Sequence, residues 1–306
     1  MQEGKMNKKP GRVLSIQSHV VSGYVGNKSA TFPLQVLGFD VDPINSVQFS
    51  NHTGYGLWKG QVLKQDELED LVKGLSANNL DNYSHLLTGY IGDAGFLKKV
   101  AQVVKQLRKV NPNLVYVCDP VMGDNGRLYV PKESMAVFKT EIVPLANIIT
   151  PNQFELEIIT DRTIKTFNDA LKAIDAVHEM GVEIVFLSST DLAADNELLS
   201  IVSKKKGQER NVLKMIFPKL PASFTGTGDL TAALFLAWYD KTNDLQVTME
   251  NTIATMQAVV KRTFQMARQS TEGDNPTVSA LELKLIQSKT DIENPTCTIA
   301  AETVDL

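Results

Sequence analysis

Five short apolar segments constrain the fold of this chain most, because several carry paired Val, Ile or Leu residues without alternating polar ones. Strands with this pattern are buried on both faces, as in parallel sheets that are covered by helices. The segments are Arg12–Ser18, His85–Ile91, Leu114–Pro120, Asn147–Thr150 and Ile184–Ser189. We therefore predict a buried strand at each of them.

Helical patterns lie between these predicted strands. Apolar residues in Phe96–Leu107 fall at positions 96, 97, 100, 103, 104 and 107, which places them on one helix face. Gln65–Leu75 and Phe167–Met180 also have helical patterns, and Gly181 fits the glycine that ends a helix. Alternating strands and helices predict an α/β fold, a mostly parallel central sheet flanked by helices in a three-layer sandwich.

The pattern changes after residue 189. Glu197–Lys205 and Asn211–Lys219 read as two strands joined by a charged turn. An apolar helix is expected from Asp229, and a second helix over Thr248–Arg268. Because we find no linker, repeat or low-complexity stretch, we predict a flexible segment over residues 1–11 and a single domain over 12–306.

Composition excludes several classes of function. The formal net charge of −4 offers no strong basic field for nucleic acid or anionic lipid. Although 43% of residues are hydrophobic, no apolar stretch approaches the ~20 residues of a membrane span. The first residues lack the apolar core of a signal peptide, and the two cysteines cannot form a disulfide framework. We therefore expect a cytoplasmic protein that binds neither nucleic acid nor membranes.

Polar residues stand at the ends of several predicted strands and in the loop before a predicted helix. In open α/β sheets, ligands bind beyond the carboxyl ends of the strands. The polar groups are Ser18-His19, Asp119-Pro120, Thr150-Pro151-Asn152, Ser188–Asp191 and the TGTGD stretch at Thr225–Asp229. Five such ends on one rim predict a polar ligand site.

Each of these groups also has a purely structural interpretation. Asn152 and Glu155 fit a capping box at the start of a helix. Gly123–Gly126 has good turn chemistry, and Ser188–Asp191 fits a second helix cap. His19 and His52 are more readily explained as hydrogen-bonded loop residues than as bases.

The TGTGD stretch is the most specific of these groups. Two glycines before an apolar helix let backbone N–H groups face an anion. No lysine follows the second glycine, so this is not a Walker A loop. Asp229 is a favourable residue at a helix start. Beside a phosphate, however, its carboxylate would repel the ligand unless it had a chemical role. We predict that Asp229 accepts a proton from the hydroxyl group that attacks phosphorus.

Several motifs give the chain a family resemblance. TGTGD resembles the signature of the ribokinase-like superfamily of small-molecule kinases. The longer segments resemble the pyridoxal kinase family, and the resemblance runs from about Arg12 to Glu293. These segments are RVLSIQSHVVSGYVGNKSATFPLQVLGFDV, NSVQFSNHTGYGLWKGQVL, LTGYIGD, VYVCDPVMGD and ITPNQFELE.

The resemblance implies a role for each matching residue. Asp229 is implied to be the catalytic base, with Gly226, Thr227 and Gly228 around the anion hole. Ser18, Thr53 and Asp229 are implied to contact the pyridine substrate. Residues implied to serve ATP are Asp119, Tyr129, Asn152, Ser188, Ser189, Leu220, Pro221, Ala222, Thr227 and Gly228. Those implied to serve metal ions are Asp119, Asp124, Thr150, Glu155 and Ser188.

The same resemblance implies an activity and its partners. It implies ATP-dependent phosphorylation of the 5′-hydroxymethyl group of pyridoxal, pyridoxine and pyridoxamine in vitamin B6 salvage. Mg²⁺ (or Zn²⁺ or Mn²⁺), K⁺ or Na⁺, and a homodimer are implied with it. Two alternatives stay open: a kinase of the same fold acting on a hydroxymethylpyrimidine or a sugar, and a non-catalytic nucleotide or B6-binding module. The stretch between Gly123 and Tyr129 is shorter than in many animal members, and the adenine segment KLPASF also differs from the family pattern.

Overall fold

The computed structural model describes residues 11–270 and 276–305. The predicted flexible segment 1–11 therefore lies outside the described residues except for Gly11. Its flexibility stays a prediction.

A ten-stranded sheet forms the middle of the described chain, in the order β12-β11-β10-β9-β8-β5-β4-β1-β2-β3. Its central strands are parallel to one another. These are β1 (Arg12–Val20), β2 (Asp40–Phe49), β4 (His85–Thr88), β5 (Val115–Cys118), β8 (Ile148–Ile149) and β9 (Ile184–Thr190). A strand lies at each of the five apolar segments, as predicted.

Antiparallel strands complete the sheet on both sides. β3 (Gly60–Val62) pairs with β2 at one edge. At the other edge β10 (Glu197–Lys206) and β11 (Glu209–Pro218) form the predicted hairpin, and β12 (Glu302–Thr303) adds to β11. β6 (Gly123–Asp124) and β7 (Arg127–Leu128) form a separate small hairpin. The sheet runs continuously from edge to edge, and the single domain over 12–306 stays a prediction.

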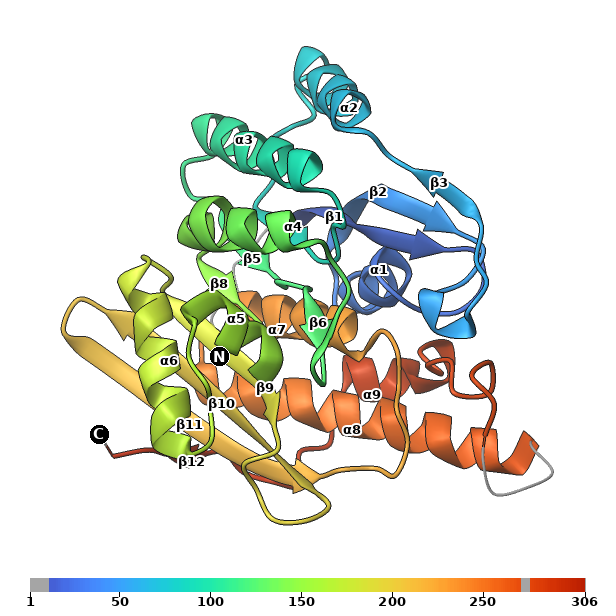
Figure 1. Cartoon of the computed structure of the whole chain (residues 1–306), viewed down its shortest axis with the longest axis vertical. Coiled ribbons are helices and arrows are strands. Elements are labelled where there is room, and N and C mark those ends of the chain that lie inside the picture. The colour runs from blue at the N-terminus through green and yellow to red at the C-terminus, as the bar shows by residue number, and fades with distance from the viewer. Residues whose placement is uncertain (1–10, 271–275, 306) are drawn as a thin grey trace, which may run out of the picture.

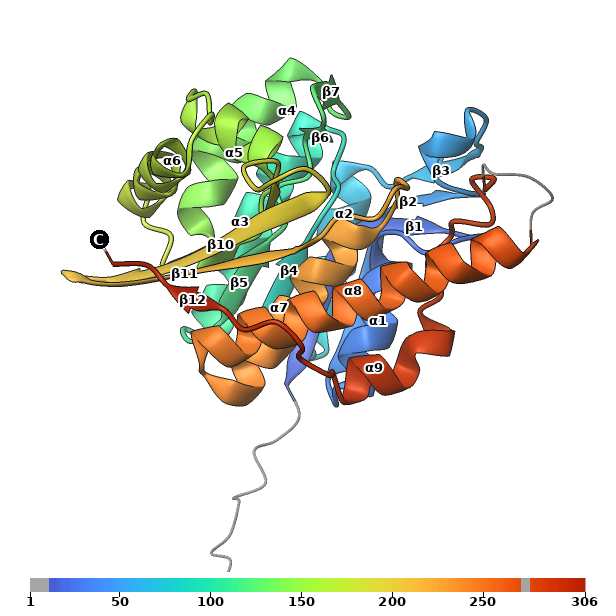
Figure 2. The same cartoon turned by 90° about the horizontal axis from the view of Figure 1, so that it is seen from below.

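Helices cover both faces of the sheet (Figures 1 and 2). One face carries α2 (Gln65–Ala77), α3 (Ala94–Val110), α4 (Lys132–Val137), α5 (Gln153–Thr160) and α6 (Phe167–Glu179). The opposite face carries α1 (Asn27–Val36), α7 (Thr227–Thr242), α8 (Leu245–Ser270) and α9 (Lys289–Glu293). Each face has its own hydrophobic core, so the predicted three-layer sandwich is confirmed.

Local sequence explains where the main helices begin and end. The Asp93 carboxylate accepts a hydrogen bond from the Phe96 N–H (2.7 Å) and caps α3. Thr166 and Asp169 form a capping box at α6, and Gly181 follows its last turn with a φ of 103°. These caps satisfy backbone groups that would otherwise lack partners at the helix ends.

The TGTGD turn lies at the start of the apolar helix α7, which packs against the sheet. Its residues from Leu230 to Trp238 are all buried, between the sheet and α8. Such all-round burial is what its unbroken apolar sequence predicts. Among residues 11–270 and 276–305, no helix has both the length and the apolar character needed to cross a membrane.

Candidate active site

The TGTGD turn at the start of α7 forms the centre of the site. Gly226 lies in the left-handed region with a φ of 88°. A Cβ atom there would stand 2.1 Å from the Tyr24 carbonyl oxygen, so only glycine fits. α7 begins at Thr227, and the first N–H groups of a helix have no acceptor within the helix. The turn therefore presents free backbone donors suited to an anion.

Asp229 is held by a backbone donor from a distant part of the chain. Its carboxylate accepts a hydrogen bond from the Gly26 N–H (2.7 Å), at the start of α1. A Cβ on Gly26 would stand 2.4 Å from the Ser18 Oγ, so Ser18 packs against the same glycine. The structure thus brings Ser18 and Asp229 together around Gly26, which was not among the predicted site residues.

The ionisation of Asp229 suits a general base. Burial raises the pKa of its carboxyl to about 6, and the Gly26 hydrogen bond lowers it in part. At neutral pH the group is therefore mostly ionised, yet it has a higher proton affinity than an exposed aspartate. A base with this pKa is well matched to work near pH 7.

Asp119 adds a second carboxylate beside the same turn. It follows β5, is buried, and accepts a hydrogen bond from the Thr150 Oγ1 (3.4 Å) through Oδ1. In the described part of the chain Oδ2 has no hydrogen-bond partner, and it faces Gly228. Burial raises the pKa of Asp119 well above its ordinary value, and the negative charges of Glu155 and Asp229 raise it further.

Glu155 confirms the predicted capping box at the start of α5. The Asn152 Oδ1 accepts from the Glu155 N–H (2.8 Å), and the Glu155 Oε2 accepts from the Asn152 N–H (2.9 Å). The Glu155 Oε1 also accepts from the Met122 N–H (3.0 Å), which ties the loop after β5 to the helix. Burial raises the pKa of Glu155 to about 8 despite these bonds. A structural role for Glu155 is therefore present, and its metal role stays a prediction.

The oxygen groups around Asp119 fit a hard divalent cation, because an unpartnered buried carboxylate oxygen is costly unless a positive group faces it. No group of three or more His, Cys, Asp or Glu side chains that could hold a metal occurs within the described ranges. A cation here would thus need further ligands from phosphate and water, as Mg²⁺ usually does.

A pocket of about 490 Å³ opens beside the TGTGD turn. Predicted residues that line it are Asp124, Asn152, Ser188, Ser189, Leu220, Ala222, Thr227 and Gly228. Apolar side chains form part of its wall, and sequence reasoning missed them: Leu198, Phe217, Phe224, Met256 and Val260. A pocket with apolar walls and a helix start at one end suits a nucleotide base and its phosphates.

A short hairpin stands at the rim of this pocket. Asn125 and Gly126 have φ values of 49° and 76°, as a two-residue type I′ turn between β6 and β7 requires. Asp124 lines the pocket from this hairpin, and burial raises the pKa of its carboxyl. Tyr129 follows the hairpin, is largely exposed, and donates its N–H to the Met122 carbonyl (2.8 Å). The predicted turn is confirmed, and it carries a predicted site residue.

Comparison with known proteins identifies the relatives of this chain. A pyridoxal kinase of Arabidopsis thaliana is 51% identical over 293 residues, which cover 95% of this chain and 94% of that protein. The chain belongs to the pyridoxal kinase family. A human pyridoxal kinase is 49% identical over 304 residues, covering 95% of this chain and 97% of the relative.

Solved structures of this family share the fold. A pyridoxal kinase of Leishmania donovani in complex with ADP and pyridoxamine superposes with a TM-score of 0.91 at 32% identity, covering 96% of this chain and all of that one. A sequence model described as phosphomethylpyrimidine kinase matches residues 72–274. This description names the kind of substrate in one of the alternatives above, a kinase of the same fold that acts on a hydroxymethylpyrimidine.

Of the residues that the resemblance assigns to ATP, Asp119, Tyr129 and Pro221 do not line the pocket beside the TGTGD turn. Thr53 is exposed on η1 (Thr53–Tyr55), and no hydrogen bond joins it to Ser18 or Asp229 in the described structure. Pro221 is exposed beside the pocket rather than in its lining. The roles assigned to both residues stay predictions.

Two structural interpretations of strand-end residues were wrong. Ser188 does not belong to a helix cap, because β9 continues to Thr190; its Oγ donates to the Pro151 carbonyl (3.2 Å). His19 lies in β1, and its buried Nδ1 has no hydrogen-bond partner among the described residues. The interpretation of His52 is confirmed, since its Nδ1 accepts from the Gly54 N–H (3.1 Å).

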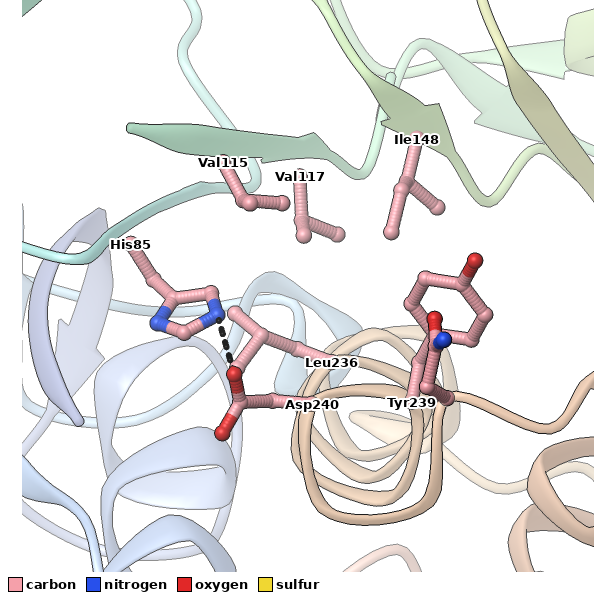
Figure 3. A pocket seen from close by; sticks show the side chains of 8 residues that line it. His85, Val115, Val117, Ile148, Leu236, Tyr239 and Asp240 are labelled. Atoms are coloured by element: carbon pink, nitrogen blue, oxygen red, sulfur yellow. Dashed lines mark ion pairs between the residues drawn. The ribbon is translucent and has the colours of Figure 1, made fainter. Parts of the chain in front are cut away.

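A second, smaller pocket of about 230 Å³ lies at the amino ends of the central strands, away from the TGTGD turn (Figure 3). Val115 and Ile148 reach it from the starts of β5 and β8, and Leu236 and Asp240 from α7. The His85 Nε2 faces the Asp240 Oδ1 at 3.5 Å. In open α/β sheets ligands bind beyond the carboxyl ends of the strands, so this pocket lies away from the candidate site.

Proposed function

We propose that this protein transfers the γ-phosphoryl group of ATP to the 5′-hydroxymethyl group of pyridoxal, and likewise of pyridoxine and pyridoxamine. One observation carries the proposal: the Asp229 carboxylate is held beside Ser18, next to the free N–H groups at the start of α7. The relatives named pyridoxal kinase, and the Leishmania enzyme that binds ADP and pyridoxamine, support the choice of substrates.

The residues of the site suit phosphoryl transfer. The pocket beside the TGTGD turn, called the nucleotide pocket below, would place ATP with its phosphates toward Thr227 and Gly228. The N–H groups of these residues would stabilise negative charge in the transition state. The substrate oxygen forms a bond to the γ-phosphorus as the bond to ADP breaks, and Asp229 accepts the hydroxyl proton. A general base of this kind contributes typically ~10²–10⁴-fold in rate.

We propose a divalent-cation site at Asp119, with phosphate and water completing the ligands; the family resemblance also assigns Asp124, Thr150, Glu155 and Ser188 to metal ions. An all-oxygen set favours Mg²⁺, with Mn²⁺ and Zn²⁺ as alternatives. The cation would neutralise charge on the phosphate oxygens when bound. The buried unpartnered oxygen of Asp119 supports this assignment.

A monovalent cation is proposed at the hydroxyl and carbonyl groups of Thr150, Pro151 and Ser188. We expect the turnover of pyridoxal to rise when K⁺ or Na⁺ replaces a bulky organic cation, because only a small ion fits such oxygens. Steady-state rates in KCl, NaCl and tetramethylammonium chloride at equal ionic strength test this. Equal rates in all three salts would remove the site.

A coupled assay of ADP release tests the proposed function. The protein is given Mg–ATP with pyridoxal, with a hydroxymethylpyrimidine or with a sugar, alone and in competition. Turnover that prefers pyridoxal supports the proposal. Preference for the pyrimidine or sugar would show a different kinase on this fold, and no turnover with any of them would favour the binding module.

We expect Ser18→Ala and Thr53→Ala to weaken pyridoxal binding more than ATP binding. Loss of one partner of a buried hydrogen bond costs about 1–3 kcal/mol, or roughly 5- to 150-fold in Kd. Isothermal titration calorimetry with each ligand measures the split. Ser189→Ala is the matched control, because Ser189 lines the nucleotide pocket and its loss should weaken ATP instead. A fall in ATP affinity alone for the first two variants would reverse the assignment.

We also propose a homodimer in the cytoplasm, built from one domain per chain. The outer edge of β3 pairs with no strand among the described residues, and Leu57, Trp58 and Val62 lie exposed on or beside it. Exposed apolar residues on an open strand edge favour association with another chain. Analytical ultracentrifugation of wild type and Val62→Lys tests this, with the variant expected to be monomeric.

A further inference from the structure

Glu282 joins three segments that are far apart in the sequence. It lies in the loop between α8 and α9, and its side chain is 10% exposed. The Glu282 Oε2 accepts from the Tyr24 N–H (3.0 Å), and Oε1 accepts from the Tyr55 hydroxyl (2.9 Å). The His52 Nε2 stands 3.3 Å from Oε1. None of the motifs discussed above includes this residue.

The contact with His52 is a hydrogen bond in which the ring donates. Because the His52 Nδ1 accepts from the Gly54 N–H, the ring proton belongs on Nε2, which donates to Glu282. Burial alone would raise the pKa of Glu282, but the hydrogen bonds from His52, Tyr24 and Tyr55 leave it below its ordinary value. Glu282 is therefore a carboxylate with donors from two loops.

The segment that carries Glu282 is firmly anchored. Leu283 and Leu285 are fully buried in the core beneath α7 and α8. The Lys284 N–H donates to the Thr263 Oγ1 (3.0 Å) on α8, and the Lys284 Nζ donates to the Glu282 carbonyl (2.9 Å). Glu282 therefore projects from a fixed base.

The segment 50–59, in contrast, has little packing of its own. His52 is its only buried residue, while Thr53 and Leu57 are exposed. The His52 ring contacts the Tyr55 ring within this segment (4.8 Å between centroids). Glu282 binds both of these side chains. Thr53 lies between them in the sequence, so we expect these two contacts to help fix its position.

The same carboxylate also reaches the loop that holds the catalytic base. A Cβ on Gly23 would stand 2.3 Å from the Glu282 Oε1, so the carboxylate lies directly on that backbone. Tyr24, which donates to Glu282, packs its carbonyl against Gly226 and lies two residues before Gly26. Glu282 thus links the Thr53 segment to the backbone around Asp229.

We propose that Glu282 is a positioning residue that fixes the Thr53 segment relative to the Gly26–Asp229 contact and so sets the affinity for the pyridine substrate. This rests on the proposed function for the identity of the substrate. The anchoring itself is a property of the free protein.

Glu282→Gln should raise KM for pyridoxal about tenfold, the scale of one lost charge-assisted hydrogen bond. KM for ATP should change less than about twofold, because the partners of Glu282 among the described residues, Tyr24, Tyr55 and His52, do not line the nucleotide pocket. Tyr55→Phe should raise KM for pyridoxal by a smaller factor. The double variant should raise this KM by less than the product of the two single factors. Asp291→Asn is the matched control: it breaks the ion pair with Arg262 (2.5 Å) nearby and should leave KM for pyridoxal unchanged.

Hydrogen exchange of the free proteins separates this proposal from the proposed function. Faster exchange at residues 22–26 and 50–59 in Glu282→Gln, but not in Asp291→Asn, is expected. Unchanged exchange, or equal rises in KM for both substrates, would overturn the positioning role. If wild type does not phosphorylate pyridoxal, the proposed function fails while exchange still decides the anchoring. If Glu282→Gln does not fold, Tyr55→Phe decides, and its unchanged KM and exchange would overturn the proposal.

Discussion

Asp229→Asn is expected to lower kcat by roughly 10²-fold or more, the scale of a lost general base, while folding and ATP binding persist. The amide oxygen of the substituted asparagine can still accept the Gly26 N–H, so the contact that holds this side chain is kept. A residue with only this structural role would therefore be replaced with little change in turnover. KM for pyridoxal should rise far less than kcat falls, because proton acceptance is needed in the transition state and not in substrate binding.

The pKa of Asp229 gives this prediction a pH dependence. Since burial raises the pKa to about 6, the base is protonated below that pH, and wild-type kcat should fall as pH drops through about 6. The folded form holds this proton more tightly than the unfolded chain. The unfolding free energy therefore declines as pH rises from the ordinary aspartate pKa to about 6.

Above pH 6 the ionised Asp229 lowers the unfolding free energy by about 1–3 kcal/mol, because burial penalises its charged form. Asp229→Asn removes this cost, so its Tm at pH 8 should equal or exceed that of wild type. Kinetics from pH 5 to 8 and thermal melting of both proteins measure these effects. A folded variant within a few-fold of wild-type turnover would leave Asp229 as a helix residue only.

The central sheet was predictable because strands buried on both faces have no alternating polar residues. β2 was not predicted, although it pairs with β1 along its whole length. Its sequence contains Asp40, Asp42 and Pro43, which break the apolar pattern. α1 has Pro33 inside it and only a weak apolar stripe, so its periodicity did not indicate a helix. Tertiary packing decides these elements more than local sequence does.

The nucleotide side of the site was also predictable, because the polar residues at strand ends share one edge of a parallel sheet. The contact between Gly26 and Asp229 was not, since 203 residues separate them and no local pattern relates the two. The apolar walls of the pocket were missed for a similar reason: Met256 and Val260 on α8 read as ordinary core residues. Glu282 has no motif of its own, and only the fold shows its three partners.

Removal of divalent cations is expected to abolish phosphorylation of pyridoxal in excess chelator, with activity restored by Mg²⁺. Several kcal/mol of charge stabilisation on the phosphoryl oxygens depend on such a cation. Asp119→Asn should therefore lower kcat/KM for Mg–ATP by roughly 10²-fold or more. Asp124→Asn, on the hairpin at the pocket rim, is the comparison variant and should have a smaller effect, because Asp124 has a hydrogen bond from Asn125 and Asp119 Oδ2 has none in the described structure.

Asp119 also predicts an effect that does not require turnover. Burial and the charges of Glu155 and Asp229 raise its pKa well above the ordinary value, so the cation-free protein should lose stability as pH rises and these carboxyls ionise. Asparagine in place of Asp119 removes one of the charges and should raise Tm at pH 8 without Mg²⁺.

A bound cation stabilises the folded protein by mass action, by about 2.7 kcal/mol at a cation concentration of 100 times Kd. Thermal melting with an ATP analogue and increasing MgCl₂ should therefore raise Tm for wild type and much less for Asp119→Asn. Equal Mg²⁺-dependent shifts in both proteins would show that the cation binds without Asp119.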